Sequence, residues 1–155
     1  MNDDIVIVIG EDDDGHAALV ERNIKRAGVI NQMIRFKNGE EVWAFFSKKS
    51  KDPSRVPGKS YLLLLDIRMP KMDGIEVLRR IKEDHELKKM PVIMVTTTDD
   101  PGEVARCHQL GCNNYIIKPV DYKKFVSAIQ QLGLFLKIVM IPHLNGDNKI
   151  DNNLN

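Results

Sequence analysis

Acidic residues stand directly after two apolar runs of this chain. Asp66 follows the run 62–65, and Glu11 and Asp12 follow the run 5–9 and a glycine. An apolar run that ends abruptly in a carboxylate is typical of a buried strand that brings an acidic side chain to the edge of a sheet. Ligands of open α/β sheets bind outside the carboxyl ends of the strands, so these residues are candidates for chemistry.

Three carboxylates would share one pocket if these two strand ends lie side by side. Carboxylates held close together repel one another unless a cation joins them. A ligand set made only of oxygen atoms suits Mg²⁺. We therefore predict an Mg²⁺ site that includes Glu11, Asp12 and Asp66.

Two more residues follow apolar runs in the same way. Thr96 follows the run 92–95 and offers a hydroxyl group, and Lys118 follows the run 114–117 and offers a cation. Phosphoryl transfer to an aspartate requires a carboxylate that attacks in line and cations that offset charge on the phosphoryl oxygens. The four strand ends together predict this reaction.

These residues make the chain resemble the response-regulator receiver domain of two-component signalling, over about residues 4–138. The resemblance depends on motifs that occur in order and at compatible spacings: Glu11-Asp12, Asp66, Met69-Pro70, Asp73-Gly74, Thr96 and Lys118-Pro119. Any one motif alone would be weak, whereas the set is highly specific.

The resemblance implies a role for each residue of the acidic site. Asp66 would be the phosphoacceptor. Asp12 would bind Mg²⁺ directly and Glu11 mainly through water, and the backbone carbonyl of Arg68 would be the third protein ligand. Asp13 and Asp14 are expected to serve the start of a helix instead of the metal.

The resemblance also implies a switch. Thr96 would follow the phosphoryl group, Lys118 would contact it, and Tyr115 would be an aromatic residue that changes rotamer. Two simpler alternatives stay open: Tyr115 as ordinary packing and Lys118 as a surface lysine. His16 is expected on the surface, near enough to the site to influence access.

Five short apolar runs alternate with helical patterns, which predicts an α/β fold with a parallel sheet covered on both faces. The expected strands are 5–9, 32–36, 61–65, 92–95 and 114–117, and the last helix is expected from about 121 to 140. The resemblance implies the flavodoxin-like receiver fold, with strand order 2-1-3-4-5.

Length and composition indicate a single domain. We expect a receiver domain over 1–141, including an extension of the last helix, and a polar, disordered tail over 142–155. The formal net charge of +1 provides no excess of positive charge that would favour binding to nucleic acid or a membrane surface. Two cysteines expected as reduced thiols, and no stretch long enough to span a bilayer, favour a cytoplasmic protein.

The expected function is that of a single-domain response regulator, not an enzyme beyond self-catalysed phosphotransfer and autodephosphorylation. Its expected partner is a histidine kinase, of the phytochrome type by resemblance. A haloacid-dehalogenase-type phosphatase would need an acid where Arg68 stands. In a flavodoxin-like FMN carrier, the four acids at 11–14 would repel the phosphate.

The segment 132–141 carries eight apolar residues out of ten. A helix that packs one face on a sheet needs an apolar stripe of about half its circumference or less. We predict a homodimer built on this helix and its extension. Two alternatives stay open: the extension folds back on its own domain, or its surface docks the kinase.

Overall fold

A computed structural model describes residues 4–47, 54–138 and 141–145. Its strands form one parallel sheet of order β2-β1-β3-β4-β5. The strands are β1 Val6–Gly10, β2 Met33–Phe36, β3 Tyr61–Leu65, β4 Val92–Thr96 and β5 Asn114–Ile117. The predicted fold class and strand order are confirmed, and each strand agrees with its prediction to within one residue.

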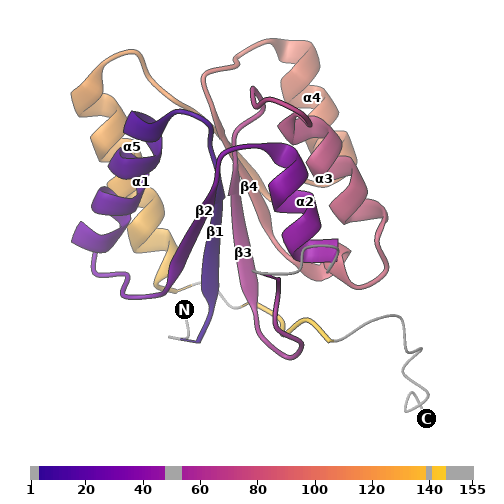
Figure 1. Cartoon of the computed structure of the whole chain (residues 1–155). Helices are drawn as coiled ribbons and strands as arrows, with labels where there is room; N and C mark the ends of the chain where they lie inside the picture. The colour runs from indigo at the N-terminus through magenta and orange to yellow at the C-terminus, as the bar shows by residue number, and fades with distance from the viewer. Residues whose placement is uncertain (1–3, 48–53, 139–140, 146–155) are drawn as a thin grey trace.

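Helices cover both faces of the sheet (Figure 1). α1 Asp14–Arg26 and α5 Tyr122–Leu136 pack together on one face. The other face carries α2 Gly39–Ser47, α3 Gly74–Glu83 and α4 Pro101–Leu110, with the short 3₁₀ helix Leu87–Lys89 after α3. In the described ranges, no helix is long and apolar enough to cross a membrane.

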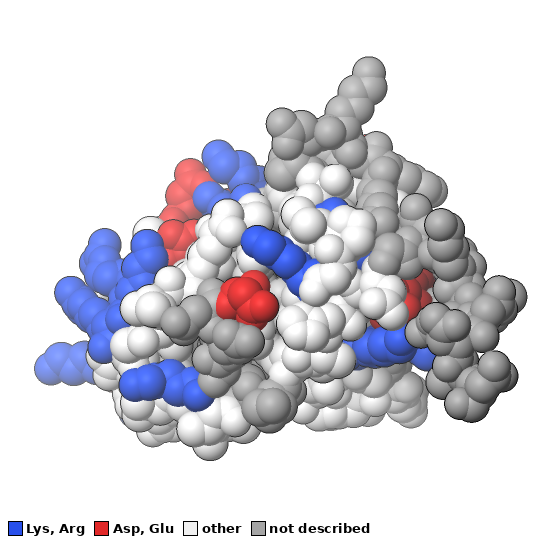
Figure 2. All heavy atoms as spheres, turned by 90° about the horizontal axis from the view of Figure 1, so that it is seen from below, with Lys and Arg blue, Asp and Glu red and all other residues white. Residues whose placement is uncertain are grey.

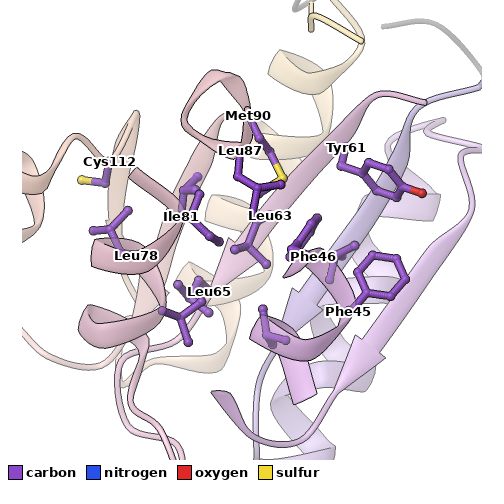
Figure 3. Packing of buried hydrophobic residues seen from close by; sticks show 14 of the residues in the cluster. Phe45, Phe46, Tyr61, Leu63, Leu65, Leu78, Ile81, Leu87, Met90 and Cys112 are labelled. Carbon is purple, nitrogen blue, oxygen red and sulfur yellow. The ribbon is translucent and has the colours of Figure 1, made fainter. Parts of the chain in front are cut away.

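The central strands β1, β3 and β4 bury side chains on both faces, which explains their nearly continuous apolar sequences. The edge strands β2 and β5 are only partly buried and include Arg35 and Asn114. In β3, Leu63 and Leu65 face α2 and α3, whereas Leu62 and Leu64 face α1 and α5. Figure 3 shows the first of these two cores, where Phe45 and Phe46 of α2 pack edge-on against Tyr61. The two cores make the sheet a rigid support for whatever its strand ends carry.

Aspartates begin four of the helices by accepting a backbone N–H in the first turn: Asp13, Asp73, Asp100 and Asp121. The expected end of the last helix was wrong. α5 ends at Leu136, because the N–H groups of Lys137 and Ile138 bond three residues back, to Leu134 and Phe135, and tighten the chain into a turn. Residues 139 and 140 lie outside the described ranges.

Residues 141–145, here called the C-terminal strap, return to the amino end of the sheet. Leu144 is fully buried in the α2–α3 core; its N–H donates to Lys59 O and its carbonyl accepts from Gly58 N. The tail was expected from residue 142, so its first four residues were assigned wrongly: one buried leucine and its backbone bonds hold them on the domain. The strap supports the fold-back alternative for this segment.

Candidate functional site

The carboxyl ends of four strands meet at the upper edge of the sheet in Figure 1. Gly10 and Leu65 pair in register, so Glu11 and Asp66 leave neighbouring strands side by side. The N–H of Asp66 also donates to Gly10 O at 2.9 Å. Thr96 ends β4, and Lys118 directly follows β5. The sheet thus gathers the residues that were predicted from four separate runs.

Lys118 bridges the two buried acids. Its Nζ donates to Glu11 Oε2 at 2.5 Å and to Asp66 Oδ2 at 2.9 Å. All three residues are at least 94% buried. Two carboxylates against one ammonium leave a net negative charge in a region of low dielectric, which is costly unless another cation or a proton joins it. The alternative of Lys118 as a surface lysine does not hold in this structure.

The pKa values of the two acids move in opposite directions. Burial raises the pKa of Glu11 to about 7, and the charge of Asp66 adds to the rise, although Lys118 opposes it. Burial also acts against ionised Asp66, but the Thr96 hydroxyl and Lys118 outweigh it and lower the pKa of Asp66. The lowered pKa favours the ionised form of Asp66, which is the state a nucleophile needs.

Three carboxylates form what we call the acidic pocket: Glu11, Asp12 and Asp66. Each offers an oxygen atom, and these atoms lie within 4.8 Å of one another. An all-oxygen donor set with excess negative charge fits Mg²⁺. The Arg68 carbonyl, expected as a further ligand, stays a prediction. The Arg68 side chain reaches α4, where it forms a two-pronged ion pair with Glu103 at 3.0 and 3.2 Å.

A short series of contacts leads from Asp66 to Tyr115. The Thr96 hydroxyl helps to lower the pKa of Asp66, and Thr96 Oγ1 accepts from Thr98 N at 3.3 Å. The Thr98 carbonyl then accepts from the Tyr115 hydroxyl at 2.7 Å. Two hydrogen bonds thus link Thr96, whose hydroxyl acts on the buried carboxyl, to a half-buried ring on β5.

The motif Asp73-Gly74 shapes the loop between β3 and α3. Asp73 caps α3 by accepting from Glu76 N at 2.9 Å. Gly74 lies against the backbone of Asp66: a Cβ there would stand 2.0 Å from Asp66 O, so no larger residue fits. Asp13 likewise caps α1, and Asp14 pairs with Arg35 at 2.7 Å. Asp13 thus serves the helix start as expected, whereas Asp14, in the first turn, pairs with cationic side chains at β2.

Sequence reasoning missed two contacts at this site. His16 was placed near the site, but its direct contact with Lys118 (Nδ1 to Nζ, 3.2 Å) was not foreseen. The Arg68–Glu103 pair was not foreseen either. The only available signal for His16 was its place three residues after the helix cap Asp13, which turns its side chain back toward the end of β1.

Comparisons with known proteins agree with this geometry. Residues 6–130 match the model of the response regulator receiver domain family. The chain is 31% identical over 139 residues to the response regulator Rcp1 of Synechocystis sp., covering 88% of this chain and 92% of that protein.

Solved structures are similar over nearly the same span. A response regulator receiver domain from Rhodospirillum rubrum is 46% identical, with a TM-score of 0.83 over 91% of this chain and 99% of that one. The Mn²⁺-bound form of Rcp1 is 30% identical, with a TM-score of 0.81 over 88% of this chain and 98% of that one. The phosphorylated cyanobacterial phytochrome response regulator RcpA is 26% identical, with a TM-score of 0.79 over 88% and 97%.

Proposed function

The chain belongs to the response-regulator receiver family, and from that premise we propose that it accepts a phosphoryl group from a histidine kinase on Asp66. One observation carries the proposal. Asp66 is a buried, ionised carboxylate at the end of β3, with an ammonium group at 2.9 Å and two further acids beside it. These are the groups that an aspartyl phosphate requires around it.

The proposed step is an in-line transfer. A carboxylate oxygen of Asp66 forms a bond to phosphorus while the bond from phosphorus to the imidazole nitrogen of the donor breaks. The donor ring, which carries a proton on its other nitrogen, leaves as a neutral histidine on the kinase, and the other product is an aspartyl phosphate. Lys118 offsets negative charge on the phosphoryl oxygens, and the Thr96 hydroxyl donates to one of them.

The acidic pocket would hold Mg²⁺ through Asp12 and Asp66, with Glu11 acting mainly through water and the Arg68 carbonyl as a further ligand. When bound, the ion would offset part of the negative charge of the carboxylates and of the phosphoryl group. The Mn²⁺-bound structure of Rcp1 supports a divalent ion at this kind of site.

The output would be a change of surface. If the Thr96 hydroxyl turns to a phosphoryl oxygen, its bond with Thr98 N changes, and the Tyr115–Thr98 bond carries that change to the face formed by α4, β5 and α5. This face exposes Ile117, Val120 and Tyr122. We propose it as the protein-interaction surface that phosphorylation alters.

We propose a phytochrome-type kinase as the partner, with the chain acting as a stand-alone regulator in the cytoplasm. The support is similarity: RcpA is by name a phytochrome response regulator, and Rcp1 matches over most of both chains. Autodephosphorylation is the only other reaction we propose for this site.

A homodimer through the end of α5 remains our proposal for assembly. Leu132 and Leu136 are buried in the domain's own core, but Leu134, Phe135 and Ile138 stay exposed. Phe135 also lines a cavity of about 330 Å³ at the amino end of the sheet. Figure 2 views the molecule from that end, where lysines and arginines gather on the left and the centre shows uncharged residues around acidic and basic side chains.

Phosphate labelling tests the central proposal. With a small phosphodonor such as acetyl phosphate and Mg²⁺, the wild-type chain should gain one acid-labile, hydroxylamine-sensitive phosphoryl group, and chelation of Mg²⁺ should prevent it. Asp66→Asn should gain none, whereas Asp84→Asn, in the loop after α3, should be labelled like the wild type. Undiminished labelling of Asp66→Asn would contradict the assignment of Asp66 as the phosphoacceptor.

Lys118→Ala tests the switch. This variant should still be labelled in part, but amide shifts of the α4–β5–α5 face should no longer respond to beryllofluoride, a stable phosphoryl mimic. Identical shifts of the wild-type face with and without beryllofluoride would contradict the proposed surface change.

Light scattering tests the dimer. At tens of micromolar the wild-type chain should have the mass of two subunits, and Phe135→Glu should have the mass of one. Ile30→Glu, which changes a more exposed apolar residue outside α5, should remain dimeric. A monomeric wild type, phosphorylated or not, would contradict the proposal.

A further inference from the structure

Lys118 has three hydrogen-bond partners on three different elements. Its Nζ contacts Glu11 Oε2 after β1, Asp66 Oδ2 after β3 and His16 Nδ1 in the first turn of α1, at 2.5, 2.9 and 3.2 Å. An ammonium group has three N–H donors and no acceptor. The three partners therefore match its full donor capacity.

The contact fixes the tautomer of His16. Because Lys118 can only donate, His16 Nδ1 must accept, and the neutral ring carries its proton on Nε2. The same nitrogen is 4.0 Å from Glu11 Oε1, which is too long for a hydrogen bond. Lys118 is therefore the partner of Nδ1 at this edge of the site.

Two other contacts hold His16 in place, one through its backbone and one through its ring. Its backbone N–H donates to the helix cap Asp13 at 2.8 Å. The ring packs edge-on against buried Phe125 of α5, with centroids 5.9 Å apart and planes at 76°. A side chain that is already ordered loses little conformational entropy when it binds Lys118.

We propose that His16 is a positioning residue for Lys118: it accepts the one N–H that neither carboxylate takes, and so keeps the ammonium group directed at Asp66. The other two acceptors change during the proposed reaction, since Glu11 belongs to the acidic pocket and Asp66 gains the phosphoryl group. An imidazole nitrogen is a poor ligand for Mg²⁺. His16 is thus the partner that stays constant for Lys118.

The rate of phosphorylation tests this role, and this experiment rests on the proposed function. His16→Ala should take a phosphoryl group from acetyl phosphate about 3- to 10-fold more slowly than wild type, as expected for the loss of one partly exposed hydrogen bond to a charged group. His16→Gln, whose amide oxygen can accept the same N–H, should recover most of the lost rate. His85→Ala, a change of an exposed histidine after α3, should have no effect.

A wild-type rate in His16→Ala, or a rate in His16→Gln no better than in His16→Ala, would overturn the positioning role. Thermal unfolding of each variant distinguishes a slow reaction from a poorly folded protein.

Nitrogen NMR provides a second readout that does not depend on phosphorylation. At about pH 8.5, above the range in which imidazoles ordinarily titrate, the ¹⁵N shifts of His16 should show a protonated Nε2 and an accepting Nδ1. A proton on Nδ1 would overturn the contact itself. If the wild-type chain takes no phosphoryl group at all, the proposed function fails, and the tautomer still decides whether His16 holds Lys118.

Discussion

The two ends of the sheet both bury charged side chains, but they compensate the charges differently. At the carboxyl end, Lys118 is shared between the acids Glu11 and Asp66. At the amino end, the charged residues Arg55 and Glu86 are about equally buried. There the partners are mostly neutral backbone groups.

At the amino end, Arg55 and Glu86 bond to backbone groups, and Glu86 also pairs with Lys89 at 3.3 Å. Arg55 donates to Phe46 O at 2.9 Å and to Asn145 O at 2.8 Å. Glu86 accepts from Asn145 N at 2.6 Å, and despite its burial this bond and the nearby charges of Lys89 and Arg55 lower its pKa. These partners do not change with pH, metal or phosphoryl group.

The difference explains why one end can respond to a signal and the other cannot. Carboxylates that compete for one ammonium group can be rearranged by a proton, a cation or a phosphoryl group, because each supplies a new partner. A guanidinium held by carbonyls of the main chain has no such alternative. Charged side chains that are about equally buried therefore support a function at the carboxyl end of the sheet and stabilise the structure at the amino end.

Removal of one acid from the pocket should have the largest effect. Asp12→Asn should weaken Mg²⁺ binding by more than about 100-fold, since it deletes a charged oxygen ligand. Calorimetric titration measures the affinity. Asp13→Asn is the matched control, because asparagine caps a helix as well as aspartate, and its affinity should stay within about threefold. Equal losses in both variants would mean that charge alone, and not ligation, binds the ion.

Removal of the buried arginine should affect stability and nothing else. Arg55→Met leaves the carbonyls of Phe46 and Asn145 without a donor, and the free energy of unfolding should fall by about 2–4 kcal/mol. Urea unfolding measures the loss. Arg22→Met, an exposed arginine of α1, should change little. If Arg55→Met altered phosphate labelling of the folded protein, the two ends would be coupled and the comparison would fail.

The stability of the metal-free protein should depend on pH through Glu11. Its pKa is about 7 in the folded protein against an ordinary 4.5, so the folded state binds this proton more tightly than the unfolded state. The contribution of Glu11 is fully present below pH 4.5 and is lost as the pH rises through 7. Asp66, with its lowered pKa, acts in the opposite sense and only below about pH 4, outside this range.

Urea unfolding in the presence of a chelator should therefore show a loss of about 1–3 kcal/mol from this group between pH 5 and pH 8. Other groups also titrate in this range, so Glu11→Gln is the reference, and the difference between the two profiles is the quantity of interest. Parallel profiles would show that Glu11 is already ionised at pH 5.

One tyrosine at each end of the sheet can be changed to phenylalanine, which removes only a hydroxyl group. Tyr115→Phe removes the bond to Thr98 O, and Tyr61→Phe removes the hydroxyl that accepts from Val56 N at 2.7 Å. Each should lower stability by about 0.5–1.5 kcal/mol. Only Tyr115→Phe should reduce the amide-shift response of α4 to beryllofluoride. A reduced response in Tyr61→Phe as well would argue for a general loosening of the core.

Much of the site could be predicted because Glu11, Asp66, Thr96 and Lys118 each stand at or just after the end of a largely apolar strand. Asp66 is the clearest case, since the strand before it is apolar and buried throughout. The parallel topology then brings the strand ends together whatever the loops do. Ligation by the Arg68 carbonyl and the role of Tyr115 depended on the family resemblance and stay predictions.

The strap and His16 could not be predicted, for different reasons. Leu144 is separated from the apolar residue Ile141 by Pro142 and His143, and such an isolated residue has no periodicity to reveal its burial. The contact between His16 and Lys118 joins residues 102 positions apart and depends on the packing of α1 against α5. Apolar content predicted the end of α5 too late because it cannot distinguish a helix from a turn that lies on the same core.

The strap also sets an order on folding. Its bond from Arg55 to Asn145 closes a loop of 90 residues, and such a closure is favourable only after the intervening strands have paired. We expect the strap to dock after the transition state, so that its loss speeds unfolding and leaves the folding rate almost unchanged. During synthesis, the ribosome completes every residue of the acidic pocket before it makes the segment that fastens the opposite end of the sheet.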